Sequence, residues 1–278
     1  MNKQVSEILK KSNYSVFLEM QMLPPKEKNA ASTLFAFYSH LNDILQSQEA
    51  VSKKTELLKL WYQEINNIYD KKVPASNIGR DIYKNCQRFR LPKSEFLALL
   101  NTVEKEIEKP LQAPTLIDFY DYCSGIAVAP SSMMLRILGC KDEKLIKKLS
   151  LSLGQAIQMT NILKDIRDDA IANKLYIPCT FLKKAGISSK DPQAVITDKN
   201  LIHARQLLAD VAEKNFEEAF SLISKLDKKT KRSIKAVAYV YKKYFDMMKQ
   251  RGWEVISPKP QLNTFSKMFL VLKAYSGR

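Results

Sequence analysis

Residues 158–170 read QMTNILKDIRDDA, and no other stretch of the chain is as informative about its fold. The amide and carboxylate side chains of this segment recur at the spacing of one α-helical face: Gln158, Asn161, Asp165, Asp168 and Asp169. The positions on the opposite face are apolar: Met159, Ile162, Leu163 and Ile166. The segment therefore predicts a helix that is buried on one side and presents amide and carboxylate oxygens on the other.

The acidic face of this helix has two interpretations. Asp165 and Asp169 are like charges one turn apart, which repel each other, and Asp has a poor helix propensity. A divalent cation between the two carboxylates would remove the repulsion, and oxygens one turn apart can converge on Mg²⁺. A solvated or capped helix face accounts for the same residues without a ligand. Spacing alone leaves both interpretations open.

The rest of the chain is also helical in pattern. Apolar residues recur at three- and four-residue steps in six runs, residues 29–48, 54–69, 94–108, 145–170, 201–226 and 231–250. Prolines and glycines fall between the runs, and Pro130 is among the residues expected to end a helix. No segment alternates as a strand does, and no internal repeat or linker divides the sequence. We expect an all-α fold with one domain over residues 1–278.

Composition excludes some functions and favours an anionic partner. The 278 residues carry 45 Lys and Arg against 29 Asp and Glu, a net charge of +16. Such a charge favours a membrane surface, a nucleic acid or a polyanionic substrate. Only 7 glycines occur, and none are spaced for a phosphate-binding loop, which argues against Rossmann and P-loop enzymes.

The cysteines and the N-terminus bear on the compartment. The four cysteines are far apart and form no C-x-x-C pair, and with only two histidines a structural zinc site is disfavoured. The first residues have no apolar run long enough for a secretory signal, and no stretch is long and apolar enough to span a membrane. We expect a reducing, cytoplasmic location, with peripheral membrane contact as an option.

The acidic segment resembles the second aspartate-rich motif of the squalene and phytoene synthases. That motif reads roughly Q-x-x-N-I-L-R-D-x-x-x-D, followed by R-x-Y-x-P, and residues 158–169 and 174–178 match it with Lys174 in place of Arg. Three further stretches are similar to the family: SNYSVFLEMQMLPP onward, FYDYCSGIAVAPSSMMLRILG and AYVYKKYFDMMKQRGWEVI. The resemblance runs from about residue 12 to 267 and is strongest to the presqualene diphosphate synthase branch.

The resemblance implies an isoprenoid synthase bundle with a central cavity between two aspartate-rich helices. It implies a head-to-head prenyltransferase that condenses two farnesyl or geranylgeranyl diphosphates with Mg²⁺-assisted loss of pyrophosphate. NADPH would be needed only for a reductive second step, which the sequence does not support.

The family's site residues carry over to matching positions. Asp165 and Asp169, with Asn161, would bind Mg²⁺, and Gln158 would support them. Lys164, Lys174 and Tyr176 would contact diphosphate, with Tyr176 counted among the catalytic residues beside the two aspartates. Aromatic residues either stabilise a carbocation in the cavity or are ordinary core, the commoner case for such side chains: Phe35, Phe37, Tyr38 and Tyr241.

The first aspartate-rich motif of the family is degenerate here. Where the family has R-x-x-D-D-x-x-D, residues 39–46 read SHLNDILQ, so Asn42, Asp43 and Gln46 would form the opposite wall with one carboxylate. Neutral amides can bind a hard cation, but the missing charges should lower its affinity. His40 could be a ligand or base, or a partly buried histidine without such a role.

Further departures lie in the central segment. Ser124 stands where the family usually has a tyrosine assigned to proton handling, and Val128 and Ser131 stand where glycine is usual. The alternative function is therefore a weakened or inactive member that binds a prenyl ligand or serves as an assembly or interaction factor. Because residues 158–169 keep the whole second motif, we expect binding of a metal-diphosphate ligand to be retained.

The C-terminal sequence FSKMFLVLKAYSGR is basic and amphipathic. It suits an anionic bilayer, to which a lipid-soluble product would be delivered. The alternative is that its apolar residues pack on the bundle: Phe265, Met268, Phe269 and Leu272. Nucleic-acid binding is disfavoured because the lysines are scattered and no binding motif is present. The sequence does not indicate an oligomeric state.

Overall fold

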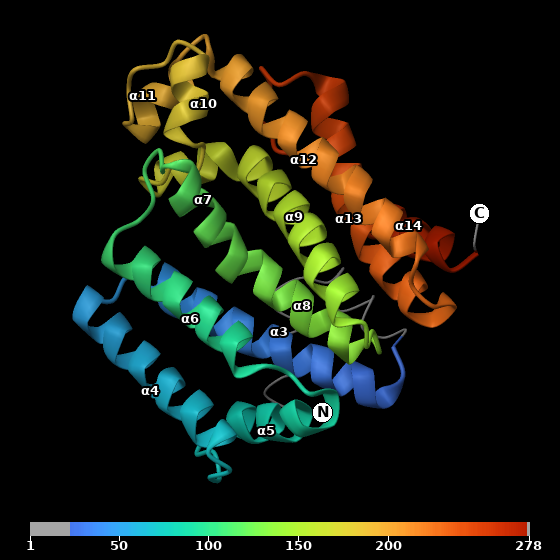
Figure 1. Cartoon of the computed structure of the whole chain (residues 1–278). Coiled ribbons are helices and arrows are strands. Elements are labelled where there is room, and N and C mark those ends of the chain that lie inside the picture. The colour runs from blue at the N-terminus through green and yellow to red at the C-terminus, as the bar shows by residue number, and fades with distance from the viewer. Residues whose placement is uncertain (1–22, 277–278) are drawn as a thin grey trace.

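A computed structural model of the chain describes residues 23–276, and most of these residues are helical (Figure 1). The helices, in chain order, are α3 (Pro25–Gln46), α4 (Val51–Tyr69), α5 (Asn77–Phe89), α6 (Lys93–Glu108), α7 (Leu116–Cys123), the π-helix η1 (Ser124–Val128), α8 (Ala129–Ile137), α9 (Glu143–Ile171), α10 (Cys179–Lys184), α11 (Pro192–Thr197), α12 (Leu201–Ser224), α13 (Lys228–Arg251) and α14 (Thr264–Ser276). Within residues 23–276 the only β-pairing is one isolated bridge, between Gln112 and Leu175. The all-α prediction is confirmed.

Each of the six predicted runs corresponds to a helix, namely α3, α4, α6, α9, α12 and α13. The polar helix α5 was not among them. It begins after Ser76, whose hydroxyl accepts a hydrogen bond from the Gly79 N–H and caps the helix. Residues 12–22, part of the N-terminal resemblance, lie outside the described residues.

The prediction that Pro130 ends a helix is wrong. Helix α7 continues through η1 into α8, and Pro130 lies in the first turn of α8. Proline has no N–H and clashes with the preceding turn of an ordinary helix. Just before it, the helix widens, and the Ala129 N–H donates to the carbonyl of Ser124, five residues back. The wider turn lets the helix pass the proline without a break.

The two largest cores of buried side chains lie in different parts of the bundle. One core joins α3, α4, α5 and α6, and includes Phe37 with its ring against Trp61 and Phe96. The other joins the buried face of α9 to α12 and α13. Figure 1 shows α9 running through the middle of the molecule, between α7–α8 and α12. A residue on the polar face of α9 is therefore held by a long helix that packs against α8 on one side and α12 on the other.

The C-terminal helix α14 packs along α13 through one narrow face (Figure 1). Val271 and Ala274 are buried there. The opposite face is exposed, and it holds Phe265, Met268, Phe269 and Leu272. The alternative in which these four residues pack on the bundle is therefore wrong, because helical periodicity turns them away from the face that meets α13.

Two further features concern membrane-spanning helices and the cysteines. Within residues 23–276, no helix combines the length and the apolar character needed to cross a bilayer. All four cysteines are present as free thiols.

Candidate active site

Helix α9 has the two faces that its sequence predicts. Met159, Ile162, Leu163 and Ile166 are buried in the core. The helix starts at Asp142, whose carboxylate accepts hydrogen bonds from the N–H groups of Lys144 and Leu145. Along the polar face, burial decreases from Gln158, which is 9% exposed, to Asp168, which is exposed. Of the alternative without a ligand, a solvated or capped face, full solvation does not describe Gln158, Asn161, Asp165 or Asp169, which are buried or partly buried.

A short backbone bridge brings the segment after α9 back beside α6. The Ala113 N–H donates to the Leu175 carbonyl at 2.8 Å, and the Leu175 N–H donates to the Leu111 carbonyl at 2.9 Å. These bonds fix Lys174 and Tyr176 on either side of Leu175. Both side chains reach the C-terminal end of α6, where they meet the carboxylate of Glu106.

Glu106 is the centre of a buried polar network. Its side chain accepts hydrogen bonds from the Tyr176 hydroxyl at 2.9 Å and from the Leu111 N–H at 3.1 Å. Lys174 Nζ lies 3.6 Å from the same carboxylate, and both charged side chains are almost wholly buried. A buried ion pair is retained only when further hydrogen bonds satisfy it, as they do here. The expected diphosphate ligand Lys174 is thus neutralised by a protein carboxylate.

The sequence analysis did not identify Glu106. A signal was present, because Glu106 falls in phase with Phe96, Leu99 and Val103 on the buried face of α6. A glutamate on an apolar face needs a partner in the fold. Its partners, Lys174 and Tyr176, lie some seventy positions away in the sequence, so periodicity could not name them.

Gln158 and Tyr122 extend the network toward α7. The Gln158 amide donates to the Tyr122 hydroxyl at 3.3 Å, and the Tyr122 ring stacks on Tyr176 with 4.8 Å between centroids. Burial raises the pKa of Tyr122 well above its usual range, with further contributions from Tyr176, Glu106 and Tyr38.

Lysines surround the outer carboxylates of α9. Lys259 Nζ lies 3.3 Å from Asp165 Oδ1 and 2.6 Å from Asp168 Oδ2. Lys164 Nζ lies 3.3 Å from Asp165 Oδ2 and 3.1 Å from Asn161 Oδ1. Ammonium groups therefore offset the charges of Asp165 and Asp168, whereas Asp169 forms no ion pair within residues 23–276. Lys259, in the segment after α13, was not identified from the sequence because no periodicity marks that segment.

Asp169 is the carboxylate with the strongest perturbation. Burial, together with the charge of Asp165, raises its pKa from 3.8 to about 7, and Lys174 offsets part of this rise. A carboxyl group with this pKa is partly protonated at neutral pH. A cation that binds beside this carboxyl group would displace its proton.

The donor set on α9 fits a magnesium ion in part. Amide and carboxylate oxygens are the ligands that Mg²⁺ prefers, and the ion commonly uses one or two carboxylates together with substrate phosphates. The destabilised carboxyl of Asp169, one turn from Asp165, is the feature that a cation would relieve. Within residues 23–276 no three His, Cys, Asp or Glu side chains converge as a complete cage. The residues fit a metal that shares its coordination with diphosphate.

The degenerate motif lies on the last turns of α3. Leu41 and Ile44 are buried, whereas Asn42, Asp43 and Gln46 are exposed. In the described part of the chain, no hydrogen bond or ion pair joins these three side chains to α9. Their role as the opposite wall stays a prediction, as does the central cavity.

The aromatic candidates and His40 have different surroundings. Phe37 belongs to the first core and is 1% exposed, so the ordinary-core alternative is correct for it. Phe35 and Tyr38 are partly buried against that core, and Tyr241 is partly buried against the second core. His40 is exposed at the surface of α3, with its ring edge-on to Trp61 at 5.6 Å.

The π-helix η1 is held tightly between α6 and α9. A Cβ atom at Gly154 of α9 would lie only 2.8 Å from the Cα of Val128, and one at Gly125 would clash with Thr102 of α6. Val128 stands where the family usually has glycine, and Gly154 on α9 provides the space for close packing at this position. The Ser124 hydroxyl donates to the Tyr120 carbonyl at 2.7 Å and its side chain is exposed. No phenol occupies the position where the family has its tyrosine.

Comparison with known proteins agrees with this arrangement. The family profile of squalene/phytoene synthase matches residues 9–266. The chain is 30% identical over 259 residues to the presqualene diphosphate synthase of Sinorhizobium fredii, covering 93% of this chain and 92% of that protein. It is 21% identical to phytoene synthase 2 of Solanum lycopersicum, covering 94% and 85%.

Solved structures share the fold. A dehydrosqualene synthase in complex with ligand superposes with a TM-score of 0.86 at 19% identity, covering 99% of this chain and 96% of that one. The squalene synthase HpnC of Alicyclobacillus acidocaldarius gives a TM-score of 0.79 at 21% identity, covering 90% and 94%.

The helical bundle therefore has the all-α fold of the squalene synthases. The chain belongs to the squalene/phytoene synthase family. It is a prenyltransferase of the head-to-head class, and the alternative of an assembly or interaction factor is not favoured.

Proposed function

We propose that this chain joins two farnesyl diphosphates to give presqualene diphosphate, one pyrophosphate and one proton, in a reaction that depends on Mg²⁺. The allylic C–O bond of one substrate breaks, new C–C bonds close a cyclopropane, and the second substrate keeps its diphosphate. No reductant enters this balance, so NADPH is not required. The polar face of α9, with Asp165 and Asp169 one turn apart beside buried Lys174, carries the proposal.

Asp165, Asp169 and Asn161 would hold the metal, with Gln158 supporting the face one turn earlier. When bound, Mg²⁺ supplies positive charge that neutralises the departing diphosphate. In the protein alone, Lys164 and Lys259 take the place of that charge against Asp165. Because ammonium groups can turn from a carboxylate to a phosphate, these lysines would contact the diphosphate once the metal neutralises the aspartates.

Tyr176 and Lys174 would position the substrate from the α6 side. Glu106 holds the Tyr176 hydroxyl and Lys174 together, 2.9 Å and 3.6 Å from its carboxylate. Preorganised donors lower the barrier because they do not have to reorient as charge develops.

The remaining parts of the site complete the proposal. Asn42, Asp43 and Gln46 would face the α9 wall with neutral oxygens and one carboxylate, and Tyr38 and Tyr241 would line the space for the prenyl chains. An apolar substrate and product also favour work at a membrane surface.

Incubation with farnesyl diphosphate and Mg²⁺ tests the proposal. We expect pyrophosphate release together with a C30 diphosphate, and loss of both on chelation of the metal. Geranylgeranyl diphosphate, supplied in parallel, tests the chain length. Absence of pyrophosphate and of any C30 or C40 product at every protein concentration would refute the proposed reaction.

A further inference from the structure

The outward face of α14 is an unusual concentration of exposed apolar surface. Phe265 is 78% exposed and Phe269 is 67% exposed, and Met268 and Leu272 continue the same stripe. The four positions follow the i, i+3, i+4, i+7 spacing of one helix face. Scattered exposed apolar residues are normal, but a contiguous group of four on a 13-residue helix marks a surface that binds something.

The helix beneath this apolar stripe is strongly basic. Helix α13 carries nine Lys or Arg residues and a single acidic residue, Asp246. Lys235 and Lys273 both lie over the ring of Tyr239, at 5.2 Å and 5.5 Å from its centroid, at the contact between α13 and α14. These side chains place positive charge beside the stripe.

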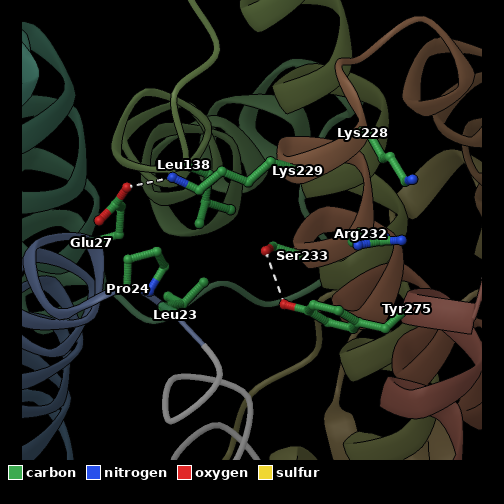
Figure 2. A pocket seen from close by; sticks show the side chains of 9 residues that line it. All are labelled: Leu23, Pro24, Glu27, Leu138, Lys228, Lys229, Arg232, Ser233 and Tyr275. Atoms are coloured by element: carbon green, nitrogen blue, oxygen red, sulfur yellow. Dashed lines mark hydrogen bonds and ion pairs between the residues drawn. The ribbon is translucent and has the colours of Figure 1, made fainter.

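A basic hollow adjoins the C-terminal end of α14. Its volume is about 340 Å³, and Lys228, Lys229, Arg232 and Tyr275 are among its lining residues. Figure 2 shows Lys229 reaching across to Glu27, at 2.8 Å, and the Tyr275 hydroxyl pointing to Ser233, at 3.3 Å. Within residues 23–276 neither Lys228 nor Arg232 forms an ion pair. Two positive charges are therefore available to an anion at this end of the stripe.

We propose that α14 and the adjoining basic hollow form a docking surface for an anionic lipid bilayer. The apolar stripe would enter the boundary between headgroups and acyl chains, and Lys228 and Arg232 would bind lipid phosphates. A second copy of this chain would bring like charges together, since its α13 carries the same excess of basic residues. Residues 1–22 have three lysines and two glutamates, so their net charge has the same sign as that of the surface.

Vesicle co-sedimentation of the full chain tests the docking surface without any substrate. We expect binding to vesicles of phosphatidylcholine mixed with phosphatidylglycerol, and much weaker binding to phosphatidylcholine alone. Phe265→Gln with Phe269→Gln should lower the partition coefficient at least roughly ten-fold. Lys228→Gln with Arg232→Gln should lower it roughly five-fold for each charge and flatten its dependence on salt.

A matched control is Val51→Gln with Leu60→Gln, which removes two exposed apolar residues from α4. This variant should bind as the wild type does. The proposal is overturned if the wild-type chain does not sediment with anionic vesicles at low salt, or if the α14 and α4 variants lose binding equally. A dimer that depends on Phe265 and Phe269, seen by sedimentation without lipid, would assign the stripe to a second copy instead. Because no turnover is measured, these outcomes are independent of the proposed reaction.

Discussion

The two walls predicted to face each other at the site, on α9 and on α3, differ in the charge of their side chains. On α9, Asp165 and Asp169 are partly buried, and each meets an ammonium group or holds a raised pKa. On α3, Asn42 and Gln46 are neutral and exposed, and Asp43 forms no ion pair within residues 23–276. The α3 wall carries little charge and needs no counter-ions. The lysines near the α9 carboxylates come from three segments: Lys164 from α9 itself, Lys174 from the segment after α9, and Lys259 from the segment after α13. Most of the electrostatic contribution to catalysis should therefore lie on α9.

The largest effect on the reaction rate is expected when a carboxylate of the charged wall on α9 is removed. Asp165→Asn removes a metal ligand and should lower the rate of pyrophosphate release roughly 10³-fold, because metal stabilisation of the leaving charge is worth several kcal/mol. Initial rates at saturating Mg²⁺ measure this loss, and far-ultraviolet circular dichroism checks the fold.

Asp168→Asn is the matched control for this substitution. Asp168 lies on the same helix and shares Lys259 with Asp165, but it is exposed. We expect less than a roughly three-fold change in rate, since exposed ion pairs contribute little. Equal losses in the two variants would show that the ion pairs with Lys259, and not a metal site, explain the acidic face.

The second prediction concerns the buried polar network around Glu106. Glu106→Gln keeps an acceptor for Tyr176 but leaves the buried Lys174 without a counter-charge. Breaking a buried pair in this way should lower the free energy of unfolding by about 3 kcal/mol. Urea denaturation measures the change. Glu108→Gln, on the exposed side of the same helix, should alter stability by less than about 0.5 kcal/mol, and a similar loss at both positions would contradict the network.

The contrast between these residues shows what the sequence can predict. The two faces of α9 followed from periodicity alone, because a helix fixes which side chains share a face. Glu106 could not be assigned as the partner of Lys174, 68 positions away, nor Lys259 as the partner of Asp165, 94 positions away, since these side chains meet only in the folded chain. Motif resemblance supplied Lys174 and Tyr176 but not the carboxylate that holds them.

The error at Pro130 has a different origin. Sequence rules treat proline as a helix end because it lacks an N–H and crowds the previous turn. The bond from the Ala129 N–H to the Ser124 carbonyl relieves that crowding, and η1 packs closely against α6 at Gly125 and against α9 at Gly154. Such a local widening is stabilised by tertiary contacts, so it has no signal in the proline itself.

The pKa of Asp169 gives the charged wall a pH dependence that the neutral wall lacks. Its folded pKa of about 7 exceeds the ordinary value of 3.8, so its contribution to stability is fully present below 3.8 and is lost as the pH rises to about 7. Relative to Asp169→Asn, the wild-type chain should lose roughly 2 kcal/mol over this range, a figure that allows for partial exposure. Chemical denaturation of both chains between these pH values, without metal, measures the difference. Parallel pH profiles would contradict the raised pKa.

The smallest expected effect comes from restoring charge to the neutral wall. Asn42→Asp with Gln46→Asp returns the two missing carboxylates, and should lower the Mg²⁺ concentration for half-maximal pyrophosphate release roughly ten-fold, because cation affinity follows the number of charged ligands. Gln48→Asp adds a charge just beyond the end of α3 and controls for a general increase in acidity. A double variant whose Mg²⁺ dependence matches that of Gln48→Asp would show that the end of α3 does not face the metal. In that case α9 would supply the only protein ligands, and the contrast between the walls would reflect a one-sided site.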